Sequence, residues 1–249
     1  MFVLLLLVLL FPGAALADTL RLGGMVRCPY ICDADVERPG FMLEVARHVF
    51  GQAGYQVEYH SLPWSRALKH VRTGHLDGIA GVLRRNAPDL VYPKQAQAFS
   101  QYVMFVPETS NWQYTGLVSL WQERIGITQD VSYGSMDSYI HRYRDTERIQ
   151  SVGGISTVAQ SLMTLARGRI SLFIEDRAVV RDYLSQAEPE RHLKEAGQLH
   201  GENIYIAFSP SNPKAEEYAQ VLTEGIDRLR ASGGLARILA AYNQPDWLF

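Results

Sequence analysis

Apolar residues recur along this chain with helical and then strand-like spacing, and one stretch shows the pattern most clearly. Within residues 64–73 the apolar positions recur at helical spacing, which predicts an amphipathic helix. Gly74 stands where a glycine commonly ends a helix. Residues 76–82, with the sequence LDGIAGV, predict a short strand that is covered on both faces. Arg84 and Arg85 follow at the carboxyl end of this strand.

The same helix–glycine–strand unit returns later in the chain. Residues 158–166 have an apolar helical pattern, Gly168 follows, and residues 170–174 predict a buried strand. The charges at the end of this second strand are acidic, Glu175 and Asp176. One unit ends in cations and the other in anions, which indicates two lobes that face a shared polar ligand. The alternative is that such units are simply common in α/β proteins.

The segments around these two units complete an α/β pattern. A strand is predicted at residues 19–26, an amphipathic helix at 41–50 and an alternating strand at 55–59. With the helix and strand that follow, this β-α-β-α-β order predicts a parallel sheet with right-handed crossovers. A long helix is predicted at 218–229.

The chain is predicted to cross between two lobes twice. A strand at residues 102–106 leads into the second lobe, and a strand at 203–208 returns to the first. Just before this return, residues 188–201 are polar and are predicted to be mostly loop. The predicted domains are lobe one, residues 18–106 with 206–249, and an inserted lobe two, residues 107–205.

The composition is that of an ordinary globular protein. The chain has 249 residues, of which 47% are hydrophobic and 20% charged, enough for one large domain or two small ones. The formal net charge of −2 argues against a dedicated nucleic-acid-binding protein, which would carry a basic excess. We therefore expect no nucleic-acid partner.

Residues 1–17, MFVLLLLVLLFPGAALA, have the pattern of a cleaved export signal. An apolar run is followed by a Pro-Gly break and an A-x-A pattern that ends at Ala17. No Lys or Arg precedes the apolar run, so an uncleaved membrane anchor is the alternative. The run is short for a membrane span of about 20 residues, which favours cleavage after Ala17. The mature chain is expected to lie outside the cytoplasmic membrane.

The cysteines fit an exported protein. Cys28 and Cys32 form the sequence C-P-Y-I-C, and an even cysteine count in an exported chain favours a disulfide. A metal site would need further ligands, and this loop contains no histidine. The disulfide is expected to hold the shape of a small loop.

In open α/β sheets, ligands bind beyond the carboxyl ends of the strands, and this rule selects candidate side chains in lobe one. Tyr30 and Trp64 offer flat faces for apolar or cation–π contact. Arg84 or Arg85 can clamp a carboxylate with two parallel hydrogen bonds. The alternatives are that Trp64 belongs to the core and that one of the arginines is a solvated surface charge.

The same rule selects candidates in lobe two. The turn of Tyr133, Gly134 and Ser135 precedes a predicted helix, and its backbone N–H groups are suited to an anion. Asp176 or Glu175 can receive an ammonium group. The alternative is that one of these acids only caps the helix that follows.

Catalytic and metal-binding signatures are mostly missing from the sequence. It contains no H-E-x-x-H, G-x-S-x-G or P-loop pattern. We therefore expect no catalytic residue, no metal site and no cofactor.

The ordered set of motifs resembles the bacterial extracellular solute-binding proteins of family 3, the type that serves amino-acid ABC transporters. The matching phrases include PGFMLEVARHVF, LPWSRALKHVRTGHLDGI, RRNAPDLVYP, LARGRISLFIEDRAVVRDYL and YIAFSPSNPKAEEYAQVLTEGIDRLRASGGLARILAAY. The resemblance implies a two-lobed periplasmic-binding-protein type 2 fold. Each lobe would be a mainly parallel sheet flanked by helices, and a two-strand hinge would join the lobes around the ligand.

The resemblance also implies roles for individual residues. Asp176 matches the acidic residue that receives an α-ammonium group, and Arg85 best matches the carboxylate-binding arginine. Tyr30 matches the ligand-stacking aromatic residue, and Gly134-Ser135 the anion-binding turn. The sequence departs from the family pattern in two places: the loop that carries the arginine is shortened, and Ser171 stands where an acid is usual.

The resulting hypothesis is a monomeric periplasmic protein, not an enzyme, that captures a small polar ligand, an amino acid or similar, for an ABC transporter membrane component. One alternative is an enzyme on the same scaffold, a dehydratase of a small carboxylic acid. Such an enzyme would need Glu175, Asp176 or His60 as its acid/base group. Another alternative is a ligand-sensing module that acts through a membrane partner.

Overall fold

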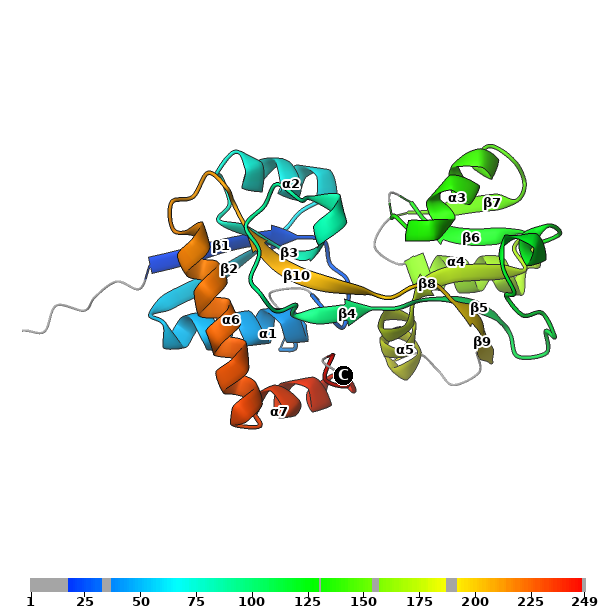
Figure 1. Ribbon diagram of the computed structural model, residues 1–249. Coiled ribbons are helices and arrows are strands. Elements are labelled where there is room, and N and C mark those ends of the chain that lie inside the picture. Colours follow the sequence, from blue (N-terminus) through cyan, green and yellow to red (C-terminus); the bar gives the residue numbers. More distant parts are fainter. Residues whose placement is uncertain (1–17, 33–36, 130, 154–156, 187–191, 248–249) are drawn as a thin grey trace, which may run out of the picture.

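The computed structural model of the protein describes residues 18–32, 37–129, 131–153, 157–186 and 192–247. The export signal predicted at residues 1–17 lies outside these ranges. In the described part, two five-stranded sheets carry the helices, one sheet in each lobe (Figure 1). None of the helices within these ranges is long and apolar enough to cross a membrane. The predicted two-lobed α/β fold is confirmed.

Lobe one is a sheet with helices on both faces. Its strands are β1 (Asp18–Gly24), β2 (Tyr55–Ser61), β3 (Gly78–Leu83), β4 (Ala98–Ser100) and β10 (Glu202–Phe208). Its helices are α1 (Phe41–Gln52), α2 (Trp64–Arg72), α6 (Ala215–Ala231) and α7 (Gly234–Ala241). The strand order is β2-β1-β3-β10-β4, with α1 and α6 packed on one face and α2 on the other (Figure 1).

Lobe two repeats this plan. Its strands are β5 (Tyr102–Pro107), β6 (Ile125–Thr128), β7 (Ile149–Val152), β8 (Leu172–Asp176) and β9 (Leu193–Gln198). Its helices are α3 (Asp137–Tyr143), α4 (Thr157–Ala166) and α5 (Arg177–Gln186). The strand order is β7-β6-β8-β5-β9, with α4 and α5 packed on one face and α3 on the other.

Both sheets are mainly parallel, as expected, and one reversed strand makes each of them mixed. In lobe one, β1 runs parallel to β2 and β3, but β10 is antiparallel to β3 and to β4. In lobe two, β6 runs parallel to β7 and β8, but β5 is antiparallel to β8 and to β9. The cause is the crossing between lobes, because a strand that arrives from the other lobe enters the sheet from the opposite end.

Glycines end the helices of both repeated units, as the sequence predicts. Gly74 follows α2 with a φ of 75°, and Gly168 follows α4 with a φ of 64°. Side chains with a Cβ rarely adopt these positive φ values, so glycine allows each helix to stop and turn directly toward the next strand.

Within residues 188–201, which the sequence predicts to be mostly loop, residues 193–198 form the strand β9. Its sequence, LKEAGQ, has little strand propensity, but β9 pairs antiparallel with β5 along the edge of the sheet. An edge strand keeps one side in solvent, so polar residues are compatible with it.

Two short connections in the described chain form the hinge. Gln101 joins β4 to β5, and residues 199–201 join β9 to β10. The backbone N–H of Leu199 donates to the carbonyl of Tyr102 at 2.9 Å, so the two connections lie side by side. The end of β8 and the start of β10 lie close to the boundary between the lobes, where the candidate side chains gather.

Candidate functional site

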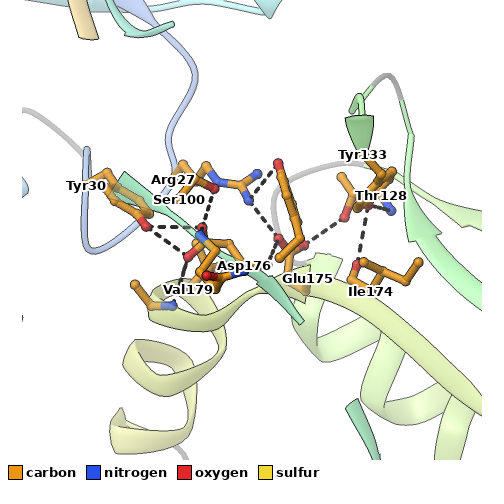
Figure 2. Close-up of polar contacts among 12 residues, drawn as sticks. Arg27, Tyr30, Ser100, Thr128, Tyr133, Ile174, Glu175, Asp176 and Val179 are labelled. Carbon is orange, nitrogen blue, oxygen red and sulfur yellow. Dashed lines mark hydrogen bonds and ion pairs between the residues drawn. The ribbon is translucent and has the colours of Figure 1, made fainter. Parts of the chain in front are cut away.

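The loop after β1 is closed by a disulfide between Cys28 and Cys32, which confirms the predicted pairing. Two backbone hydrogen bonds support it. The N–H of Arg27 donates to the carbonyl of Ile31 at 2.6 Å, and the N–H of Ile31 donates back at 3.0 Å. This short closed loop holds Arg27 and Tyr30 toward lobe two (Figure 2).

Tyr30 connects the loop to lobe two through its hydroxyl. Its side chain is only 3% exposed, and its ring lies 5.3 Å from that of Phe41. The hydroxyl lies 3.0 Å and 3.1 Å from the two carboxylate oxygens of Asp176. Burial, reinforced by the charge of Asp176, raises the pKa of Tyr30 well above its ordinary value. The hydroxyl therefore stays protonated and can donate to the carboxylate.

Asp176 is fully buried at the start of α5. Besides the tyrosine hydroxyl, it accepts a hydrogen bond from the hydroxyl of Ser100 at 2.5 Å. The backbone N–H groups of Gln101, Ala178 and Val179 donate to it at 3.2, 2.8 and 3.2 Å. Its carboxylate thus satisfies N–H groups of the first turn of α5, as a helix cap does.

Glu175 forms the charged contact between the lobes. Its Oε1 accepts from Nη2 of Arg27 at 2.8 Å and from the backbone N–H of Asp176 at 2.8 Å (Figure 2). Its Oε2 accepts from the hydroxyl of Thr128 at 2.9 Å. The side chains of Glu175 and Arg27 are 4% and 20% exposed. The pair is therefore largely shielded from water, which strengthens its electrostatic attraction.

Arg27 remains charged in this position. Burial lowers its pKa, but the electrostatic influence of Tyr102, Glu175 and Asp176 outweighs burial, and the net pKa is raised well above its ordinary value. The guanidinium carbon lies 5.5 Å from the centre of the Tyr102 ring, and Nη2 lies 3.3 Å from the Tyr102 hydroxyl. An aromatic face and a carboxylate thus hold a permanent cation between the lobes.

Arg85 makes a second contact between the lobes. Its Nε lies 2.7 Å and 2.8 Å from the carboxylate oxygens of Glu202, at the start of β10. Its Nη1 donates to the hydroxyl of Ser132 in lobe two, and its Nη2 lies 3.4 Å from the carbonyl of the same residue. The guanidinium that the sequence assigns to a ligand carboxylate is here paired with a carboxylate of the protein.

Arg84 and Trp64 contact lobe one. The guanidinium carbon of Arg84 lies 4.4 Å from the ring centre of Tyr92 and 5.3 Å from that of Tyr205. Trp64 begins α2 and packs, half-buried, against the apolar cluster beneath that helix. Beside the hinge lies a cavity of about 430 Å³. Its lining residues are Arg84, Arg85, Phe99, His200, Gly201, Glu202, Asn203 and Tyr205.

Tyr133 belongs to the core of lobe two. Its ring lies 4.9 Å from that of Tyr102, and its hydroxyl accepts from the backbone N–H of Thr128 at 2.7 Å. Burial raises its pKa well above the ordinary value. Tyr133 therefore contacts Tyr102 and Thr128, the two residues that in turn contact Arg27 and Glu175.

The turn of Gly134 and Ser135 starts a short 3-10 helix that leads into α3. Gly134 has a φ of 63°, and Ser135 is exposed. One donor of the turn is already used, because the backbone N–H of Tyr133 donates to Asp137 at 2.6 Å. The carboxylate of Asp137 occupies part of the position that the sequence assigns to an anionic ligand.

The structure brings some predicted site residues together and separates others. Tyr30, Glu175 and Asp176 form one cluster (Figure 2). Asp176 pairs with groups of lobe one other than Arg85, which in turn binds Glu202. No cluster of three or more His, Cys, Asp or Glu side chains that could hold a metal ion occurs among the described residues.

Three residues of the site, Arg27, Ser100 and Glu202, are not predicted from the sequence. Arg27 stands at the start of a loop that follows a strand, next to Cys28, and this position was the available signal. Glu202 and Ser100 join the site only through the pairing of β10 with β4, in which they lie opposite one another. That pairing cannot be read from local sequence.

Fold and site together define a two-lobed α/β protein with a polar, charged contact region between its lobes. The family model "Bacterial extracellular solute-binding proteins, family 3" matches residues 26–245, so the chain belongs to this family. A search among curated protein sequences gives no match.

Solved structures share the fold at low sequence identity. The ligand-binding core of GluR0 in complex with L-glutamate gives a TM-score of 0.71 at 16% identity, over 92% of this chain and 99% of that one. A mutant of ArgBP from T. maritima gives 0.70 at 17%, over 90% and 95%. A histidine kinase sensor domain with similarity to periplasmic binding proteins gives 0.67 at 20%, over 90% and 95%. At these identities the likeness concerns the fold.

Proposed function

We propose that this protein is a periplasmic solute-binding protein that holds a small polar ligand, an amino acid or a similar molecule, between its lobes. Its partner would be the membrane component of an ABC transporter. The observation that carries the proposal is the ion pair of Arg27 from lobe one with Glu175 from lobe two. This pair puts opposite charges where a ligand between the lobes would lie.

The hinge supports a protein that opens and closes. The chain crosses between the lobes only through Gln101 and residues 199–201 within its described part. The contacts of Arg27 and Arg85 across the boundary are polar, so water or a ligand can replace them when the lobes separate. A ligand that contacts both lobes favours the closed form by the difference in its affinity for the two forms.

The export features and the structural neighbours are consistent with this function. The export signal predicted at residues 1–17 would place the mature chain in the periplasm, where a disulfide such as Cys28–Cys32 persists. The neighbours include an arginine-binding type of protein and a receptor core with L-glutamate, which favour an amino acid or a similar molecule as ligand.

Thermal unfolding of the mature chain tests the proposal against a panel of amino acids, polyamines and small organic acids. A ligand at a hundredfold excess over its Kd stabilises the fold by about 2.7 kcal/mol. For a chain of this size, that stabilisation corresponds to a rise in Tm on the order of 5–10 °C. Mass spectrometry of small molecules released from the purified protein identifies a ligand that the panel lacks.

Two further measurements separate the competing functions. Small-angle scattering should show a smaller radius of gyration when the stabilising ligand is added, because the lobes close around it. The ligand should be recovered unchanged after long incubation with the protein. Consumption of a candidate acid would instead indicate an enzyme on this scaffold. A chain that neither responds to the panel nor carries a ligand would contradict the proposal.

A further inference from the structure

Among the described residues, only one of the three guanidinium nitrogens of Arg27 has hydrogen-bond partners. Its Nη2 contacts Glu175 at 2.8 Å and the hydroxyl of Tyr102 at 3.3 Å. Its Nε and Nη1 have no hydrogen-bond partner among the described residues. Because a guanidinium carries five N–H groups, most of the donor capacity of Arg27 is unused.

The unused nitrogens of Arg27 reach solvent. Its side chain is 20% exposed. In the described part of the chain, the buried side-chain nitrogens without a partner are Nη1 of Arg148 and Nε1 of Trp247. Because Nε and Nη1 of Arg27 are not among them, these free N–H groups are not fully enclosed by the described residues. A charged donor in such a place is available to an anion.

The two acids of the same cluster, Asp176 and Glu175, are less available to a ligand than Arg27 is. Asp176 is fully buried and accepts from five donors among the described residues. Glu175 is 4% exposed and accepts from three donors in this part of the chain. A carboxylate has about four acceptor positions, so an incoming ammonium group at Asp176 would have to displace a donor of the protein, and Glu175 has only about one position left.

All three guanidinium nitrogens of Arg85 have partners, unlike those of Arg27. Its Nε is paired with Glu202, its Nη1 contacts Ser132 and Asn86, and its Nη2 faces the carbonyl of Ser132. A ligand carboxylate at Arg85 would therefore compete with a carboxylate that the protein already supplies. At Arg27 it would add to the existing contacts.

Resting on the proposed function, we propose that Arg27 binds the anionic group of the ligand and that the ligand class is small carboxylates, whose amino group is dispensable. One carboxylate oxygen accepts from Nη1 of Arg27 while Glu175 stays on Nη2. Both carboxylates share one guanidinium, and the ring of Tyr102 lies beside it. The pair with Glu175 thus holds the guanidinium in place for the ligand.

Calorimetric titration with matched compounds tests this inference. For alanine, leucine, phenylalanine and glutamine, whose side chains carry no carboxylate, the panel contains the amino acid, its 2-oxo acid and the amine left when its α-carboxylate is removed. For the side chains that bind, we expect the amino acid and the oxo acid to have Kd values within tenfold of each other. The amines should show no binding at a hundredfold higher concentration.

Substitution of Arg27 tests the residue itself. Arg27→Gln should raise the Kd for the carboxylates about 10- to 100-fold, as expected for loss of a charged hydrogen bond. Arg27→Lys keeps the cation and should recover part of the affinity, which shows that charge and not folding is responsible. The matched control is Arg72→Gln, which removes an arginine paired with Asp89 on the surface of lobe one and should leave the Kd unchanged.

The outcomes separate this inference from the proposed function. Binding of the amines without the oxo acids, or an unchanged Kd in a folded Arg27→Gln variant, would overturn the role of Arg27 and leave the solute-binding function standing. Failure of every compound to bind, with no ligand in the purified protein, would overturn both.

Discussion

The hydroxyl of Tyr30 in lobe one lies 3.0 Å from Oδ1 of Asp176, the last residue of β8 in lobe two. Both side chains are buried. Through Asp176, the contact connects the disulfide loop to the first turn of α5. Asp176 is thus tied both to its own helix and to the opposite lobe. A ligand that binds Asp176 would have to break its contacts with Tyr30 or with the first turn of α5.

Removal of the Tyr30 hydroxyl should destabilise the protein. Tyr30→Phe keeps the ring but leaves the buried charge of Asp176 with one donor fewer, at an expected cost of about 1.5–3 kcal/mol. Urea unfolding measures this loss. Tyr205→Phe is the control, because the Tyr205 hydroxyl has no hydrogen-bond partner among the described residues, and its stability should change by less than about 0.5 kcal/mol. Equal losses in both variants would contradict the assignment.

Stability should decrease at alkaline pH. Burial raises the pKa of Tyr102 to about 12 in the folded protein, compared with about 10 for an unperturbed tyrosine. Its contribution to stability is complete below about pH 10 and is lost as the pH rises through about 12, because the unfolded chain releases this proton more readily. Urea unfolding between pH 8 and pH 12 measures the decline. It should be shallower in Tyr102→Phe, and an identical decline would argue against a role for Tyr102.

The contact between α1 and α6 should be intolerant of added volume. A Cβ at Gly225 would lie 2.2 Å from Cγ1 of Val49, so Gly225→Ala should destabilise lobe one by about 1–3 kcal/mol. Gly51 in α1 has nothing within 4 Å of its would-be Cβ. Gly51→Ala should therefore raise stability by about 0.5–1 kcal/mol through helix propensity. Thermal unfolding of the two variants should show shifts of opposite sign.

Loss of the disulfide should weaken both the fold and ligand binding. Replacing Cys28 and Cys32 by serine opens a very short loop, for which the chain-entropy model gives about 2 kcal/mol. Binding should weaken as well, because the loop positions Arg27 and Tyr30. Titration of the ligand with and without dithiothreitol measures this. Reductant should weaken binding by the wild type and should not affect the serine variant.

Local sequence predicted the elements well where periodicity and glycine act together. The helix–Gly74–strand and helix–Gly168–strand units are present, because a positive φ after a helix is a local property of the chain. The edge strand β9 was missed, because its strand conformation comes from pairing with β5 and not from its own residues.

The polar partners at the lobe boundary were less predictable. The acids at the end of β8 were expected to face a ligand, yet Asp176 is held by Ser100, which precedes it by 76 positions. Arg85 is paired with Glu202, 117 positions away. Such partners depend on how two sheets meet at a hinge, and no periodic pattern encodes that meeting.

The place of β10 has a consequence for the order in which the lobes fold. The described strands of the second sheet, β5 to β9, all lie within residues 102–198, whereas the first sheet needs β10 between β3 and β4. A chain that emerges amino end first therefore presents all of lobe two while lobe one still lacks an inner strand. Lobe two can fold as soon as β9 has emerged, and lobe one closes last by a long-range pairing, the slower kind of step.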